Sequence, residues 1–477
     1  MIEVSENIKS YLTSLYGKNS ADEYVYFIRH EPTQYIRVNN LKANKKSLMK
    51  RLRDDLSIST EEIELIPNAL KIKSGNQFLG KTIEHIIGQY YIQGLSSMIP
   101  PLILNPSSND IVLDLCSAPG SKTTGLGEMM NNRGTLLANE IALERVKMLV
   151  YNIDRMNLMN TGVMHFKGES LSKTFTEYFD KILVDAPCSG LGIIQKKEEV
   201  SNWWSLERVA RLGELQLRLL IAAIKMAKVG GEIVYSTCTL TPEENEFVIN
   251  KVLHKYPVEI EEIELPVKSR EAFTSYNGDI FHPSLSKARR IVPWEVDSDG
   301  FFIVKLKKTG TTNSPDLLDL KSSVTRLLNH EHKDVRKLLE MVEQEFGIEN
   351  NILSSYKFLK KKNDIYFVNN KWEENNLDLF ERIGTKFGLI DKGNKITLHT
   401  QAAQVLEKYI SKKIYVIENH DDLKKYLEGG IIRKDTPIDG QCVVKYRDYI
   451  LGTAVIANGG VKSRFPRSKR TQEISFL

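Results

Sequence analysis

Hydrophobic and polar residues alternate in two patterns between residues 109 and 310. Short apolar runs, each followed by a loop of small or polar residues, alternate with longer stretches whose apolar residues recur at helical spacing. The short runs are typical of buried strands and the longer stretches of helices. Strands that alternate with helices predict βαβ units, so we expect an α/β domain built on a parallel sheet.

The expected strands are 111–115, 134–139, 162–166, 182–184, a run that begins after Gly231, and a closing strand at 300–306. A helical stretch is predicted from Trp203 to Lys228. Thr241-Pro242-Glu243-Glu244 is typical of a helix start with Thr241 as N-cap. Ligands of open α/β sheets bind beyond the carboxyl ends of the strands, so the loops after these strands are expected to carry the chemistry.

The pattern changes on both sides of this region, which predicts four domains. Residues 1–75 form a Lys-, Asn- and Glu-rich N-terminal extension, and residues 76–310 the α/β domain. Residues 311–384 form a connecting α+β domain, and residues 385–477 carry short β-like runs, 441–445 and 449–457 among them. From the residues alone, the N-terminal extension fits a packing subdomain and an RNA-facing extension equally well.

Composition narrows the class of protein. Of the 477 residues, 41% are hydrophobic and 27% charged, which is typical of a globular protein, and no apolar stretch is long enough to span a membrane. The N-terminus lacks the features of a secretory signal. Four cysteines are too few for a disulfide scaffold, which favours a reducing, cytoplasmic setting.

The positive charge gathers at the C-terminal end. The net charge is +5, and residues 431–477 hold nine Lys or Arg against four Asp or Glu. Five of these cations surround Phe465 and Pro466: Lys462, Arg464, Arg467, Lys469 and Arg470. The segment is predicted to contact phosphates of a nucleic acid, and the alternative is a solvated terminus.

A glycine turn follows the first predicted strand. The sequence Asp114-Leu-Cys-Ser-Ala-Pro-Gly-Ser-Lys-Thr123 lets the backbone approach a ligand and opens a helix toward it. It matches neither the dinucleotide pattern nor the phosphate loop. Glu140, at the end of the second strand, is suited to accept hydrogen bonds from ribose hydroxyls. Together these features predict a nucleoside-type cofactor.

Two cysteines come directly after strands. Asp185-Ala-Pro-Cys188 ends one strand, and Cys238 follows another, so both should face one crevice. Cys116 and Cys442 fit inert packing. No histidine or CxxC spacing near the pair indicates zinc or redox chemistry, so no metal is expected. Nucleophilic catalysis remains.

A thiolate beside a carboxylate and a methyl-donor site suits carbon methylation of a pyrimidine. Addition of a thiolate to C6 of cytosine makes C5 nucleophilic toward a sulfonium methyl group. An acid near N3, for which Asp185 is placed, stabilises the adduct. The base must be single-stranded or flipped out for a thiol to reach C6.

Three motifs resemble those of RNA cytosine-C5 methyltransferases of the NOL/NOP2/Sun type. They are Asp114 to Thr123, Asp185-Ala-Pro-Cys-Ser-Gly-Leu-Gly and Tyr235-Ser-Thr-Cys-Thr-Leu-Thr-Pro-Glu-Glu-Asn-Glu. The stretches 37–42 and 88–98 are similar to that family's N-terminal extension. Residues 429–435 and the basic tail resemble the PUA-like extension of the bacterial 16S ribosomal RNA methyltransferase F group.

The resemblance implies a Rossmann-like class I methyltransferase sheet with S-adenosylmethionine as cofactor. It assigns Cys238 as nucleophile, Cys188 to product release, Asp185 to stabilisation at N3 and Lys122 to orienting that carboxylate. The cofactor would contact Cys116, Ser117, Ala118, Pro119, Gly120, Ser121, Lys122, Glu140, Lys167 and Asp185. Lys167 stands where the family usually has an aspartate, and Glu169 is a possible substitute.

For the substrate, the resemblance implies RNA, foremost 16S ribosomal RNA or the small ribosomal subunit, bound by a monomer. Arg37 and the tail residues Lys462 to Arg470 are the expected RNA contacts. Two alternatives stay open: a transfer RNA cytosine-C5 methyltransferase, and a ribosome-assembly RNA-binding factor that has lost catalysis.

Overall fold

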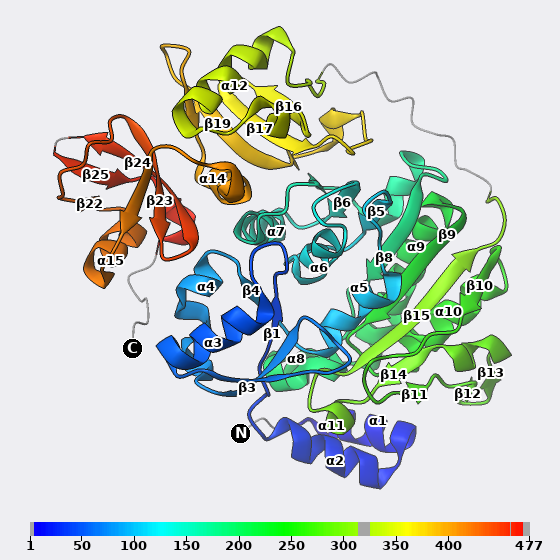
Figure 1. The fold of residues 1–477 in the computed structure, drawn as a ribbon. Coiled ribbons are helices and arrows are strands. Elements are labelled where there is room, and N and C mark those ends of the chain that lie inside the picture. The colour runs from blue at the N-terminus through cyan, green and yellow to red at the C-terminus, as the bar shows by residue number, and fades with distance from the viewer. Residues whose placement is uncertain (1–3, 313–324, 458, 471–477) are drawn as a thin grey trace.

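The fold is taken from a computed structural model that describes residues 4–312, 325–457 and 459–470 (Figure 1). Four sheets of four or more strands follow one another along the chain. They are an N-terminal four-stranded sheet, a central ten-stranded sheet, a second four-stranded sheet and a C-terminal five-stranded sheet.

The central sheet confirms the predicted α/β class. Its parallel part contains, in spatial order, β7 (Thr161–Met164), β6 (Thr135–Asn139), β5 (Ile111–Asp114), β8 (Phe179–Asp185) and β9 (Ala227–Thr237). The antiparallel β15 (Phe301–Lys308) lies beside β9. The chain leaves β5 toward β6 on one side and reaches β8 on the other, so the direction of strand order reverses at β5. Such a switch point is where α/β proteins bind ligands.

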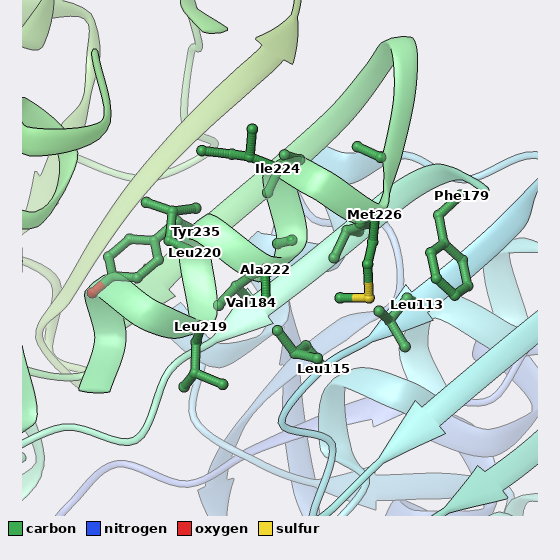
Figure 2. Close-up of a cluster of buried hydrophobic side chains, with 14 of the residues drawn as sticks. Leu113, Leu115, Phe179, Val184, Leu219, Leu220, Ala222, Ile224, Met226 and Tyr235 are labelled. Atoms are coloured by element: carbon green, nitrogen blue, oxygen red, sulfur yellow. The ribbon is translucent and has the colours of Figure 1, made fainter. Parts of the chain in front are cut away.

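Both faces of the central sheet are covered by helices, and residues two apart along a strand share a face. Leu113, Val184 and Tyr235 pack with α9 (Leu206–Met226) and α10 (Glu246–Leu253). Figure 2 shows this cluster, with Leu219, Ala222 and Met226 of α9 lying over the strands. Alternate residues face α6 (Ser121–Met129) and α7 (Leu143–Met156). The continuous apolar runs of the sequence follow from burial on both faces.

One element boundary differs from the prediction. The helix was predicted to reach Lys228 and the next strand to begin after Gly231, but α9 ends at Met226 and β9 begins at Ala227. The pairing of β9 with β8 shifts register between Phe179 and Lys181. A side chain at Gly231 would lie 2.9 Å from the carbonyl oxygen of Lys228, so this glycine permits the close approach at the irregularity.

The N-terminal sheet has the order β2-β3-β1-β4, with bounds β1 Tyr35–Val38, β2 Ser59–Glu62, β3 Ala69–Ser74 and β4 Tyr90–Ile92. It is preceded by a helical hairpin, α1 (Glu6–Tyr16) and α2 (Lys18–Ile28), which packs on Leu191, Trp204 and Leu240 of the catalytic region. Further helices here are α3 Lys45–Leu56, α4 Ile83–Ile86 and α5 Ile99–Leu104.

The remaining elements of the central region are short. They are α8 Glu199–Trp203, α11 Pro293–Val296, β10 Val258–Glu261, β11 Arg270–Glu271, β12 Ser275–Tyr276, β13 Asp279–Ile280 and β14 Arg289–Ile291. The predicted helix start at Thr241 is a 3-10 turn, Pro242–Glu244, and α10 begins two residues later.

Two further sheets complete the chain, and Figure 1 shows the connecting sheet beside β6 and the C-terminal sheet at the left of the view. The connecting sheet contains β16 Tyr356–Lys361, β17 Asp364–Asn369, β19 Thr385–Ile390 and β20 Ile396–Leu398, with helices α12 Lys333–Phe346 and α13 Asn350–Leu353. The C-terminal sheet contains β21 Ile414–Ile417, β22 Ile431–Ile432, β23 Gln441–Tyr446, β24 Tyr449–Ala457 and β25 Gly460–Ser463, with α14 Thr400–Val405 and α15 His420–Glu428.

The predicted domain boundaries at residues 75, 310 and 384 remain a prediction, and the elements near two of them are as follows. The N-terminal sheet extends past residue 75, because β4 pairs with β1. Near residue 384, β18 (Arg382–Ile383) pairs with β7 of the central sheet, and β19 directly after it belongs to the connecting sheet. None of the helices in the described ranges has both the length and the apolar composition of a membrane span.

Candidate active site

The two cysteines predicted to face one crevice lie in contact. The sulfur atoms of Cys188 and Cys238 are 3.1 Å apart, and both side chains are half-buried. Cys188 follows β8, and Cys238 follows β9, so parallel pairing of these strands brings the two loops together. Its contact with Cys238 and its burial raise the pKa of the Cys188 thiol. The sequence-based expectation of a shared crevice agrees with this geometry.

Glu244 joins the two cysteine loops. Its buried carboxylate accepts hydrogen bonds from the Ser189 amide at 2.8 Å, the Ser189 hydroxyl, the Thr241 hydroxyl at 2.7 Å and the Gln216 amide at 2.9 Å. Gln216 also donates to the carbonyl of Pro187 at 2.8 Å. Burial raises the pKa of Glu244, while these donors oppose the shift. The network fixes the backbone on either side of the cysteine pair.

A close backbone contact further fixes the Cys238 loop. The amide of Gly192 donates to the carbonyl of Cys238 at 3.0 Å, and the amide of Gly300 donates to the carbonyl of Gly192 at 2.8 Å. A side chain at Gly192 would lie 2.4 Å from the Gly300 oxygen. Only glycine fits where the loop after Cys188 meets the loop that contains Gly300, which explains why Gly192 stands in this motif.

Asp185 and Lys122 form an ion pair beside the cysteines. Lys122 Nζ lies 2.8 Å from Asp185 Oδ2, and the Ser236 hydroxyl donates to Asp185 Oδ1 at 2.8 Å. Lys122 also donates to the Ser97 hydroxyl at 3.0 Å. Burial alone would lower the pKa of Lys122, but Asp185 more than offsets it and the pKa is raised. The ammonium group therefore stays charged and holds the carboxylate in one orientation.

A cleft of about 730 Å³ opens onto these groups. Lys122, Asp185 and Cys238 line it on the side of the central sheet. The N-terminal sheet and the segments next to it supply the other side, including Gln34, Tyr35, Asn76, Gln77, Leu79 and Gly80. The catalytic groups thus lie where the N-terminal sheet meets the carboxyl edge of the central sheet.

The glycine turn after β5 lies next to the Asp185 pair. Asp114 is fully buried, and it accepts a hydrogen bond from the Thr123 hydroxyl at 2.7 Å through Oδ2. Its Oδ1 has no partner among the described residues. Burial raises the pKa of Asp114 to about 7. Ser117 donates to the carbonyl of Asn139 at 2.8 Å, and Gly120 has φ of +107°, which favours glycine.

Glu140 and Lys167 follow the next two strands. Glu140 is buried, accepts a hydrogen bond from the Ala142 amide at 2.9 Å and pairs with Arg145 at 3.1 Å. Lys167 is exposed and Glu169 half-buried. The apolar side chains of Ile141 and Phe166 are 55% and 38% exposed at these strand ends. Exposed apolar surface beside a buried carboxylate suits a ligand with a flat ring and hydroxyl groups.

The structure contradicts the prediction that Arg37 contacts RNA. Its side chain is buried, and all its nitrogens donate within the protein. Nη2 and Nε bond Glu128 at 2.9 and 3.1 Å, Nη1 bonds Gln93 and the carbonyl of Ser121, and Nη2 also bonds Thr124 at 2.7 Å. No donor is left for a phosphate. Arg37 instead fastens the N-terminal sheet to α6, the helix that carries Lys122.

The basic segment at 462–470 is an ordered strand and turn rather than a solvated terminus. Val461 and Phe465 are buried in the C-terminal core, while Lys462, Arg464 and Arg467 are exposed. This alternation is that of a strand with one face on a core. Three of the five cations therefore stay available to an anionic partner.

Lys469 and Arg470 differ from the other three cations of this segment. Lys469 is buried and donates to the carbonyl of Asp154, at the end of α7, at 3.1 Å. Burial lowers its pKa to about 8. The predicted phosphate contact at Lys469 is therefore wrong, because the side chain joins the C-terminal sheet to the central domain. Arg470 is exposed, and its Nε donates to the carbonyl of Phe465 at 3.2 Å.

Known proteins resemble the chain over its full length. A family model described as 16S rRNA methyltransferase RsmB/F matches residues 101–307. Ribosomal RNA small subunit methyltransferase F of Shewanella sp. (strain ANA-3) is 30% identical, covering 100% of this chain and 99% of that protein. A tRNA (cytosine(49)-C(5))-methyltransferase of Pyrococcus abyssi is 34% identical, covering 64% of this chain and 98% of that protein.

A solved structure shares the fold of about two thirds of the chain. The crystal structure of a methyltransferase homologue from Pyrococcus horikoshii superposes with a TM-score of 0.55 at 31% identity, covering 64% of this chain and 100% of that one. Sheet order, glycine turn and strand-end carboxylates define a class I methyltransferase. The chain belongs to the 16S rRNA methyltransferase RsmB/F family. This membership confirms the predicted class of enzyme, an RNA cytosine-C5 methyltransferase.

Proposed function

We propose that this enzyme forms 5-methylcytosine in the RNA of the small ribosomal subunit, with S-adenosylmethionine as cofactor. The observation that carries the chemistry is the 3.1 Å contact between the sulfur of Cys188 and that of Cys238, because Cys238 lines the cleft together with Asp185 and Lys122. The observation that favours the target is the full-length match to proteins named small-subunit ribosomal RNA methyltransferases.

The residues at the strand ends fit the cofactor. The turn from Cys116 to Lys122 would contact its amino-acid part, and the Glu140 carboxylate would accept from the ribose hydroxyls. Exposed Ile141 and Phe166 would pack on its purine ring. When bound, S-adenosylmethionine supplies the methyl group as an activated sulfonium.

Cys238 is the nucleophile in this proposal, because it lines the cleft with Asp185 and Lys122. Its thiolate forms a bond to C6 of the target cytosine. The electron pair of the C5–C6 double bond moves to C5, which makes C5 nucleophilic. The proton that leaves the Cys238 thiol is taken up at N3 as the ring gains charge, and the Asp185 carboxylate stabilises the adduct by accepting the hydrogen bond from the N3–H group. Lys122 and Ser236 hold Asp185 in place for this role.

Cys188 completes the cycle as the group that releases product. After C5 has gained its methyl group, the hydrogen on C5 must leave as a proton. The Cys188 thiolate takes this proton, the C5–C6 double bond re-forms and the bond from C6 to Cys238 breaks. Contact between the sulfurs places the base next to the adduct.

Lys462, Arg464 and Arg467 are the candidates for RNA contact outside the cleft, because they are exposed on β25 and the turn after it. Exposed cations on an ordered strand bind phosphates independently of sequence.

A small-subunit target, a transfer RNA target and an inactive binding factor differ in which RNA is labelled. Purified protein would be incubated with tritiated S-adenosylmethionine and total RNA from a strain that lacks the gene.

Label in small-subunit RNA, mapped by bisulfite sequencing to cytidines that are unmethylated in the deletion strain, supports the proposal. Label confined to transfer RNA favours the second candidate, which the match to a tRNA methyltransferase keeps in view. The absence of label in every fraction would contradict catalysis and favour the binding factor.

A further inference from the structure

The two walls of the active-site cleft differ in charge. From residues 32–35 and 76–80, the N-terminal wall contributes Gln34, Asn76 and Gln77, and no charged residue among those described as lining the cleft. The wall from the catalytic domain contributes all the charged residues in the lining, which are Lys122, Lys196 and Lys197 together with Asp185 and Asp299. Phosphates are bound by cations, whereas base edges are read by groups that offer both a donor and an acceptor.

Three of the four amides that line this side of the cleft, Gln34, Asn76 and Gln77, have free hydrogen-bonding groups, whereas the fourth, Gln93, accepts from Arg37 at 2.8 Å. None of the first three side chains bonds another residue in the described part of the chain. Each amide carries a carbonyl oxygen and an NH₂ group, so each can pair with a base edge in the way that Asn and Gln pair with adenine. In single-stranded RNA these edges are accessible, because the bases are unpaired.

The turn that carries Asn76 and Gln77 is held by close contacts on both sides. Asn76 and Gln77 begin a 3-10 turn that follows Gly75, whose φ is +81° and whose missing side chain would lie 3.0 Å from Ile58. The turn is anchored by fully buried Leu79, whose carbonyl accepts from the Tyr90 hydroxyl at 2.6 Å. Preorganised groups lose little entropy when they bind, which favours selective recognition.

The two rim lysines of the other wall differ: one forms an ion pair within the protein and the other is free to bind a ligand. Lys196 pairs with Asp299 at 2.8 Å. Lys197 is exposed at the rim, and its ammonium group has no ion pair in the described chain. A phosphate is the natural partner for such a group at the edge of a cleft that holds a flipped nucleotide.

We propose that the N-terminal wall reads the base of a nucleotide next to the target cytidine, through Gln34, Asn76 and Gln77, while Lys197 binds the RNA backbone. The inference rests on the proposed function. It adds the substrate feature that selects one cytidine over others: single-stranded sequence on the flank of the flipped base. The cleft volume of about 730 Å³ leaves space for such a neighbour, because pockets of this size hold ligands larger than a single base.

The test uses a pool of RNA in which the nucleotides on both sides of the methylated cytidine are randomised. Methylated molecules are identified by bisulfite sequencing after reaction with the wild-type enzyme, the triple variant Gln34→Leu/Asn76→Ala/Gln77→Leu and Lys197→Gln. Gln344→Leu and Lys337→Gln on the exposed face of α12 are matched controls outside the cleft. Thermal midpoints confirm that each variant is folded.

The triple variant should lose about tenfold of the wild-type preference at a flanking position, because an amide pair is worth that discrimination or more. Its salt dependence of RNA binding should not change. Lys197→Gln should keep the preference but lower the slope of log affinity against log salt by about 0.7. Both controls should match the wild type.

Three results overturn the inference alone. The first is a wild-type enzyme without a preference at the flanking positions, and the second is a triple variant that keeps the wild-type preference. A triple variant whose salt slope falls while its preference persists also overturns it, since those side chains would then contact backbone. Failure of the wild-type enzyme to methylate any RNA overturns the proposed function and this inference with it.

Discussion

The carboxyl edge of the central sheet and the basic segment at 462–470 differ in how sequence relates to chemistry. At the sheet edge, Asp185, Cys188 and Cys238 meet because parallel strands end side by side, so the pattern of apolar runs places them together. In the basic segment, by contrast, lysines have two different roles: one is exposed to solvent and another joins two domains. Lys462 is exposed, whereas Lys469 is buried against Asp154 of another domain.

The difference lies in the range of the determining contacts. Strand ends follow from local apolar pattern and from the rule that ligands bind at the switch point. Whether a cation is available depends on tertiary partners far away in the chain. Arg37 illustrates this, because it is satisfied by Glu128, 91 positions further on. Periodicity contains no information about such a partner.

Substitution of the nucleophile is the largest expected effect and tests the sheet edge directly. Cys238→Ala removes the thiolate that activates C5, so methyl incorporation into RNA should fall to background in a tritium-transfer assay. Cys442→Ala is the matched control, because Cys442 is buried in the C-terminal sheet away from the cleft, and it should retain activity. Methylation by Cys238→Ala at a measurable rate would contradict the role given to the sheet edge.

Glu244→Ala should cause the next largest effect, a loss of about 2–4 kcal/mol in the free energy of unfolding. The change leaves the buried donors of Ser189, Thr241 and Gln216 without an acceptor. Denaturant unfolding gives the value. Half-buried Glu243, its sequence neighbour, accepts from the Tyr11 hydroxyl, and Glu243→Ala should cost less. Equal losses for both variants would show that the network adds nothing.

Asp114 should give the central domain a pH dependence. Its pKa is about 7 when folded against an ordinary 3.8, so the folded protein binds the extra proton between these values. This contribution to stability therefore falls as pH rises through that window. Asp114→Asn removes this titration. As pH rises from about 5 to about 8, the unfolding free energy of the variant relative to that of the wild type should therefore increase by about 2–3 kcal/mol, at roughly 1.4 kcal/mol per pKa unit. A constant difference in unfolding free energy would contradict the buried, protonated state.

Neutralising the exposed cations of the basic segment is the smallest expected effect and sharpens the comparison. The variant Lys462→Gln/Arg464→Gln/Arg467→Gln should bind RNA more weakly and with a flatter salt dependence, by about 0.7–0.9 in slope for each phosphate that is no longer neutralised. Lys469→Met should leave the slope unchanged, because its ammonium group bonds Asp154. If Lys469→Met alone flattened the slope, the Lys469 side chain would have to face the RNA instead of Asp154.

Much of the fold and part of the site could be predicted from the sequence. The α/β sheet, the cysteine pair and the Asp185 crevice follow from strand patterns. The role of Glu244 could not be predicted, because an acidic residue after Thr241-Pro242 equally fits the first turn of a helix. Its partners lie on the loop after β8 and on α9, so only packing of the whole domain reveals it. The amides of the cleft wall were missed for the same reason.

The most direct test of the central claim is to trap the intermediate. Cys188→Ala, incubated with substrate RNA and S-adenosylmethionine, should accumulate a covalent protein–RNA adduct that survives denaturation, and peptide mapping should place the RNA on Cys238. The adduct should be absent from Cys188→Ala/Cys238→Ala. Normal turnover by Cys188→Ala, or an adduct on any other residue, would contradict the account.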